Sequence, residues 1–201
     1  MDALVIVAHP DDETIFCGGL LLRRARWHWT VLSLCRADDG DREPRFRRAC
    51  RHLGARGIIS DLDDGRPLAP IDPARDIAPR IRRHVGAQAW DLCITHGANG
   101  EYGHPRHRQV HAEVLRMARD GELDCRRLWT FALHCDSQGN CRLGNEADLS
   151  LALSAEELAE KRRIVRELYG FAPDSFEART CTALEGFHSG RQRGGRRFEA
   201  S

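Results

Sequence analysis

The sequence predicts an α/β fold with a mainly parallel sheet, built as a single domain. Short, uncharged and β-branched segments alternate along the chain with segments whose apolar residues have helical spacing. A chain of 201 residues is long enough for one domain with a full hydrophobic core. Ligand sites in such folds lie beyond the carboxyl ends of the strands, so functional residues are expected directly after predicted strands.

The N-terminal part of the chain carries most of this alternation. We predict strands at residues 3–8, 30–35, 57–60 and 90–95. We predict helices from 13 to about 26, at 45–53, at 74–85 and from 107 to about 119. The Pro-rich stretch 63–73 and the polar stretch 96–105 are expected to be loops. The first strand ends at Pro10, and Asp11 or Asp12 can cap the helix that follows.

After Gly121 the pattern changes. We predict a strand at 127–134, a polar loop at 136–148, a helix at 154–169 and a last strand at 177–188. Ser154 caps the helix, and Glu157 completes a capping box. Residues 189–201 are rich in Gly and Arg and lack periodicity. We therefore expect one domain over 1–188 and a flexible basic tail over 189–201.

Composition restricts the function classes. An apolar content of 41% and a net charge of +1 are typical of a globular protein. The N-terminus lacks a basic signal-peptide region, and no stretch approaches the ~20 apolar residues of a membrane span, so we expect a cytoplasmic protein. No aromatic residues interleave the basic tail, which argues against nucleic-acid binding. The eight cysteines form no Cys-x-x-Cys motif and are expected to be reduced and mostly buried.

Chemistry-bearing residues lie in two loops, each directly after a predicted buried strand. The first loop holds His9, Asp11 and Asp12, and the second ends at His107. Imidazole and carboxylate groups suit zinc, and a catalytic zinc ion has three protein ligands with a remaining position for water. Both loops would open at the same edge of the sheet, so together they predict a zinc site. The alternative for the first loop is a solvated turn whose aspartate caps a helix.

The two adjacent acids of the first loop can take two different roles. His9 precedes Pro10, which favours extended backbone at His9 and the start of a turn at Pro10. Asp11 and Asp12 then point in different directions. One carboxylate can bind the metal while its neighbour accepts a proton from the attacking water.

These motifs resemble a known family. Ala8-His9-Pro10-Asp11-Asp12-Glu13 followed by Gly18-Gly19, and later Gly103-His104-Pro105-x-His107, are similar to the zinc-dependent N-acetylglucosaminyl deacetylases called the PIG-L or LmbE-like family. The resemblance extends from residue 3 to about 115, with a weaker echo at Lys161 and at 185–187. It implies a Rossmann-like α/β fold with helices on both faces of the sheet. It also implies hydrolysis of an N-acetyl group on an amino sugar to acetate and a free amine.

The resemblance also implies residue roles. The zinc ligands carried over are His9, Asp12 and His107. Asp11 is then the general base, and His104 and Tyr102 lie near the acyl carbonyl. A protonated His104 or the Tyr102 hydroxyl would stabilise the oxyanion. Iron(II) is an alternative metal, because His and Asp accept both ions.

The predicted function is removal of an N-acetyl group from an N-acetylglucosamine-type conjugate by a metal-dependent hydrolase. Two alternatives stay open: an amide hydrolase acting on a natural-product or thiol-precursor substrate, and a metal-binding regulatory protein with impaired catalysis. The substrate is expected to be a small molecule. The short chain leaves little beyond the core fold to wall the site, so a partner subunit in a homo-oligomer could supply further walls.

One residue departs from the family pattern. Arg106 lies between Pro105 and His107, where the family usually has Asp. An arginine pointing inward would make His104 a poorer acid, because a nearby cation favours the neutral imidazole. If Arg106 points to solvent, Glu101 could take over the role of the missing acid, or the arginine could contact an anionic substrate group.

Other candidate residues have structural explanations. His111 lies one helical turn after His107 and is its rival as a ligand. His96 is expected to be a loop residue only. His134, Cys135 and Cys141 are expected to be surface residues rather than a second metal site. Four arginines in the predicted helix at 45–53 and just before it are expected to form a solvated basic face: Arg42, Arg45, Arg47 and Arg48.

Overall fold

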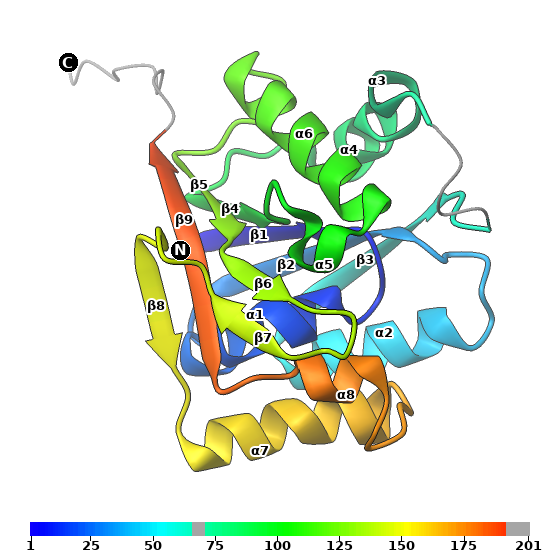
Figure 1. The fold of residues 1–201 in the computed structure, drawn as a ribbon. Coiled ribbons are helices and arrows are strands. Elements are labelled where there is room, and N and C mark those ends of the chain that lie inside the picture. The colour runs from blue at the N-terminus through cyan, green and yellow to red at the C-terminus, as the bar shows by residue number, and fades with distance from the viewer. Residues whose placement is uncertain (66–70, 192–201) are drawn as a thin grey trace.

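The computed structural model describes residues 1–65 and 71–191 and contains a seven-stranded sheet with helices on both faces (Figure 1). The strand order is β3-β2-β1-β4-β5-β9-β8. Strands β1 to β5 pair in parallel, β9 is antiparallel to β5, and β8 is antiparallel to β9. Their bounds are β1 Asp2–Val7, β2 His28–Cys35, β3 Ala55–Leu62, β4 Leu92–Thr95, β5 Arg127–Phe131, β8 Leu149–Ala152 and β9 Leu184–Arg191. The predicted mainly parallel α/β fold is confirmed.

The helices form two layers. Figure 1 shows α1, α2 and α7 on one side of the sheet and α3, α4 and α6 on the other. The helices and the single π-helical turn η1 are α1 Asp12–Arg23, α2 Arg42–His52, α3 Pro73–Asp76, α4 Ala78–Val85, α5 Gly100–Gly103, α6 Pro105–Arg119, α7 Ala155–Arg163, η1 Ile164–Leu168 and α8 Phe176–Thr180. Among the described residues, no helix has both the length and the apolar composition needed to cross a membrane.

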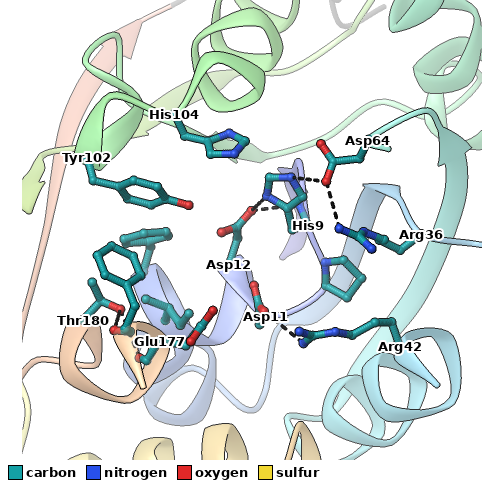
Figure 2. Close-up of a pocket in the computed structure, with 14 residues that line it drawn as sticks. His9, Asp11, Asp12, Arg36, Arg42, Asp64, Tyr102, His104, Glu177 and Thr180 are labelled. Atoms are coloured by element: carbon teal, nitrogen blue, oxygen red, sulfur yellow. Dashed lines mark hydrogen bonds and ion pairs between the residues drawn. The ribbon is translucent and has the colours of Figure 1, made fainter. Parts of the chain in front are cut away.

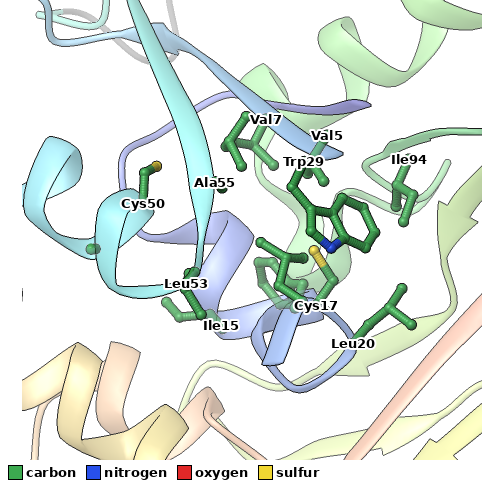
Figure 3. Packing of buried hydrophobic residues seen from close by; sticks show 14 of the residues in the cluster. Val5, Val7, Ile15, Cys17, Leu20, Trp29, Cys50, Leu53, Ala55 and Ile94 are labelled. Carbon is green, nitrogen blue, oxygen red and sulfur yellow. The ribbon is translucent and has the colours of Figure 1, made fainter. Parts of the chain in front are cut away.

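The central strand β1 explains why two helical layers form. Its side chains alternate between the faces, so Val5 and Val7 join the core beneath α1 while Leu4 and Ile6 join the core beneath α6. Figure 3 shows Val5 and Val7 beside Trp29 and Cys17 in the first of these cores. Burial of both faces fixes the strand, and with it the loop that begins at its carboxyl end.

A kink divides α1. Cys17 has non-helical angles (φ −144°, ψ 18°), so the N–H groups that follow lose their intrahelical acceptors. The buried Glu185 carboxylate of β9 accepts the N–H groups of Gly19 (2.7 Å) and Leu20 (2.9 Å) and pairs with the buried Lys161 ammonium at 2.7 Å. The Gly18-Gly19 pair and the weaker family resemblance at Lys161 and Glu185 therefore belong to one structural arrangement.

The structure corrects several element boundaries. The predicted strand at 177–188 begins instead as α8, because the Ser175 hydroxyl accepts the Ala178 N–H and caps a short helix. Strand β9 extends to Arg191, so the first three residues of the predicted tail belong to the sheet. The rest of that tail (192–201) and part of the predicted loop (66–70) lie outside the described residues. Strand β8 and the short α5 were not predicted, and the predicted loop at 136–148 contains the short strand β7 Cys141–Leu143.

The cysteine prediction was wrong for one pair. Cys135 and Cys141 form a disulfide between the short strands β6 Leu133–Cys135 and β7 Cys141–Leu143. The antiparallel register places these two residues directly opposite each other. The remaining six cysteines are buried free thiols, as expected. Because Cys135 and Cys141 are joined in a disulfide, their thiolates are not available to bind a metal with His134.

Candidate metal centre

The predicted ligands meet at one edge of the sheet. Strands β1 and β4 are paired with Ile6 opposite Thr95, so the loops that follow them are adjacent. His9 Nδ1 lies 3.3 Å from Asp12 Oδ2 and 3.1 Å from His107 Nε2, and the last two atoms are 3.4 Å apart. Ligands bound about 2.0–2.1 Å from a tetrahedral zinc ion are separated by about 3.3–3.4 Å. The three atoms therefore have the spacing that a zinc ion requires.

Glu101 orients His107. Its Oε2 atom accepts from His107 Nδ1 at 2.6 Å, which leaves the Nε2 lone pair facing His9 and Asp12. Such carboxylate–imidazole pairs commonly fix the tautomer of a metal ligand. Although burial raises the pKa of Glu101, His96 and His107 lower it to about 2, so the acceptor is ionised. The sequence indicates Glu101 as an acid partner for His104, whereas in the structure its carboxylate contacts His107 and His96.

His96 is more than a loop residue, which corrects the prediction. Its ring is fully buried and stacks on His107 with centroids 3.8 Å apart. Nδ1 contacts Glu101 Oε2 at 2.8 Å, and Nε2 accepts the Ala8 N–H at 2.9 Å. Because both nitrogens are engaged, His96 supports the ligands of the centre and is not available as a fourth one. Sequence reasoning missed this role because it depends on the pairing of β1 with β4.

Asp11 and Asp12 diverge as expected (Figure 2). Asp12 Oδ2 faces His9, whereas Asp11 Oδ2 faces Arg42 Nη1 at 3.4 Å. Asp11 has φ 126° and ψ −29°, a conformation that costs a non-glycine residue of order 1–3 kcal/mol. The buried Glu13 carboxylate accepts the Asp11 N–H at 3.1 Å and stabilises this conformation. Neither aspartate caps α1 through its side chain, contrary to the prediction.

Electrostatics favour a cation at this centre. Burial lowers the pKa of His9, but Asp12 and Asp64 outweigh it and raise the pKa to about 10. Burial and the neighbouring Asp12 raise the pKa of Asp11 well above its usual range. The surroundings thus stabilise positive charge on His9 and raise the proton affinity of Asp11 beside it.

A pocket of about 260 Å³ opens in front of these groups. Most pockets for whole ligands are larger, about 300–1,000 Å³. Its walls come from the two ligand loops, from the start of α2, from the loop after β3 and from α8, and they include His9, Asp11, Asp12, Arg36, Arg42, Asp64, Tyr102, His104, Phe176, Glu177 and Thr180. Arg42, predicted to lie on a solvated face, therefore lines the pocket. The contribution of α8 was missed because this segment was predicted as a strand.

Tyr102 and His104 also line the pocket (Figure 2). Burial and the nearby aspartates raise the pKa of Tyr102, so its hydroxyl remains a hydrogen-bond donor. Burial, together with His107 and His9, lowers the pKa of His104 to about 4. His104 Nδ1 is buried and has no hydrogen-bond partner among residues 1–65 and 71–191. His104 is thus neutral at pH 7, which disfavours the expectation of a protonated His104.

Arg106 points inward. Its side chain is 1% exposed. Nη1 donates to Gln109 Oε1 (2.8 Å), and Nη2 donates to the Asp63 carbonyl (2.9 Å). Arg106 does not line the pocket, so it contacts neither solvent nor a substrate group there. His111, the rival of His107, contacts the His96 carbonyl through Nδ1 at 2.8 Å and belongs to no metal-binding group of described residues.

The chain resembles known proteins over the region that forms this centre. Residues 4–118 match the family described as PIG-L, GlcNAc-PI de-N-acetylase. A relative from Thermobifida fusca, 1D-myo-inositol 2-acetamido-2-deoxy-alpha-D-glucopyranoside deacetylase, is 30% identical over 153 residues, a match covering 56% of this chain and 52% of the relative. The chain spans about half the length of the curated relatives it matches.

Solved structures share the fold at lower identity. N,N'-diacetylchitobiose deacetylase from Pyrococcus horikoshii has a TM-score of 0.68 and 13% identity, covering 94% of this chain and 83% of that one. The 4-carboxy-2-hydroxymuconate hydratase from Pseudomonas putida has a TM-score of 0.67 and 16% identity, covering 99% and 100%. Since these two proteins carry out different reactions, the likeness shows the fold alone. The matched residues 4–118 include every predicted ligand, and the chain belongs to the PIG-L, GlcNAc-PI de-N-acetylase, family.

Proposed function

We propose that this protein is a zinc-dependent hydrolase that removes the N-acetyl group from an N-acetylglucosamine-type conjugate. The observation that carries the proposal is the triangle of His9 Nδ1, Asp12 Oδ2 and His107 Nε2, with sides of 3.1, 3.3 and 3.4 Å. Family membership supports the reaction class, because the matched family and the relative from Thermobifida fusca are both described as deacetylases of acetylated glucosamine linked to an inositol.

A zinc ion held by His9, Asp12 and His107 would polarise the acetamide carbonyl and make hydroxide attack feasible near neutral pH. Asp11 accepts the proton of the attacking water, because its carboxylate borders the same pocket and is not part of the triangle. The Tyr102 hydroxyl donates a hydrogen bond to the oxyanion that forms on the carbonyl oxygen. Asp11 then returns its proton to the departing nitrogen as the C–N bond breaks, which yields acetate and a free amine.

The pocket volume indicates which part of the substrate enters the pocket. A space of about 260 Å³ suits an acetamido sugar better than a whole conjugate. We therefore place the acetamido group at the triangle and the aglycone towards Arg36 and Arg42, whose side chains are 46% and 30% exposed.

The test is amine and acetate release by the zinc-loaded protein from N-acetylglucosaminyl-inositol, with N,N'-diacetylchitobiose as a second substrate. Asp11→Asn keeps the shape of the side chain and removes its basicity, so we expect activity to fall by about 10²–10⁴-fold. Asp174→Asn, at an exposed position outside the pocket, is the matched control and should retain activity. Full activity of Asp11→Asn would contradict the proposed base, and absence of turnover on both substrates would contradict the proposed reaction.

A further inference from the structure

Asp64 lies behind the ligand His9, on the side opposite the triangle. His9 Nε2 is 3.3 Å from Asp64 Oδ2, while His9 Nδ1 faces Asp12 and His107. A neutral imidazole carries a proton on one nitrogen only, so a ligand that binds through Nδ1 must hold its proton on Nε2. Asp64 is the acceptor placed to receive that proton.

Arg106 holds the segment that carries Asp64. It donates to the carbonyl of Asp63, one residue before Asp64, at 2.9 Å. Arg106 Nε and Asp64 Oδ1 lie 3.8 Å apart, and both are buried without a hydrogen-bond partner in the part of the chain that the structure describes. Arg36 Nη2 contacts Asp64 Oδ2 at 3.2 Å from the other side. Two guanidinium groups thus flank the carboxylate that lies behind His9 (Figure 2 shows the contacts with His9 and Arg36).

We propose that Asp64 and Arg106 are positioning residues for the metal ligand His9: Asp64 selects the tautomer that presents Nδ1, and Arg106 fixes Asp64. This inference rests on the proposed zinc centre. It also explains the arginine at the position where the family pattern has an acid. The Arg106 guanidinium acts on His9 through the loop after β3, so an arginine at this position does not indicate lost catalysis.

The experiment measures zinc affinity by competition with a chromogenic chelator, and the absorption spectrum of the cobalt(II)-loaded protein. Loss of such an outer carboxylate typically weakens metal binding by about 10–100-fold, so we expect this for Asp64→Ala. Arg106→Met should weaken zinc binding in the same range, and the double variant should bind like Asp64→Ala, because Arg106 acts through Asp64. Asp64→Asn keeps an acceptor oxygen and should recover part of the affinity.

Arg116→Met is the matched control, because Arg116 lies on the same helix and pairs with Glu113 and Glu122 away from the centre. Its zinc affinity should equal that of the unaltered protein. Unchanged zinc affinity and cobalt spectrum in Asp64→Ala would overturn the proposal, as would additive losses in the double variant. If Arg106→Met does not fold, Arg106→Lys takes its place in the cycle. Failure of the unaltered protein to bind zinc would instead contradict the proposed function.

Discussion

At the scale of residues, the two loops supply groups with complementary tasks. His9, Asp12 and His107 form a triangle suited to a cation, while Asp11 borders the pocket with a pKa raised by burial and by Asp12. Tyr102 stays protonated because burial raises its pKa. A hydrogen-bond donor and a proton acceptor are therefore both present beside the proposed zinc position.

Tyr102 provides a direct test of oxyanion stabilisation. Burial lowers the pKa of His104, and its buried Nδ1 has no hydrogen-bond partner among the described residues, so we expect the Tyr102 hydroxyl to be the donor to the oxyanion. Tyr102→Phe removes only the hydroxyl, and we expect kcat to fall by about 10²–10³-fold with little change in zinc affinity. His104→Gln should cost less. Steady-state kinetics of both variants check the ranking, and a larger loss in His104→Gln would reverse these roles.

At the scale of elements, the kinked helix α1 depends on a buried ion pair. Glu185 and Lys161 are both fully buried, and Glu185 also accepts two N–H groups after the kink. Removing one partner leaves an uncompensated buried charge. The start of α1 carries Asp12, so the packing of this helix influences the proposed centre.

Glu185→Gln should therefore lower the free energy of unfolding by about 3–5 kcal/mol in urea titrations. The double variant Lys161→Met/Glu185→Gln should be less destabilised than Glu185→Gln alone, because neither charge remains buried. Equal destabilisation of the single and double variants would show that the lost N–H contacts, rather than the unpaired ammonium, determine the cost.

The hairpin β6–β7 offers a second test at this scale. Eight cysteines and one disulfide leave six thiols, so titration of the denatured, unreduced protein should find six. Closing a loop of this length contributes about 2 kcal/mol in the chain-entropy description. Reduction should lower the midpoint of thermal unfolding accordingly, and so should Cys141→Ser. Eight titratable thiols would contradict the pairing.

At the scale of the whole molecule, the sequence predicted the parallel core and the meeting of the two loops, because both follow from strands with uncharged, β-branched residues. Roles that depend on contacts between distant segments were not predictable. His96 acts through the pairing of β1 with β4, and Asp64 reaches His9 from a loop whose position no spacing reveals. Helix α8 has only five residues, too few for a reliable periodic signal.

The proposed function requires that this chain holds one zinc ion between its two loops. Crystals of the zinc-reconstituted protein, with data collected on both sides of the zinc absorption edge, test it most directly. We expect one anomalous peak about 2.0–2.2 Å from His9 Nδ1, Asp12 Oδ2 and His107 Nε2. A fully loaded protein with its peak elsewhere, or with no peak between these atoms, would contradict it.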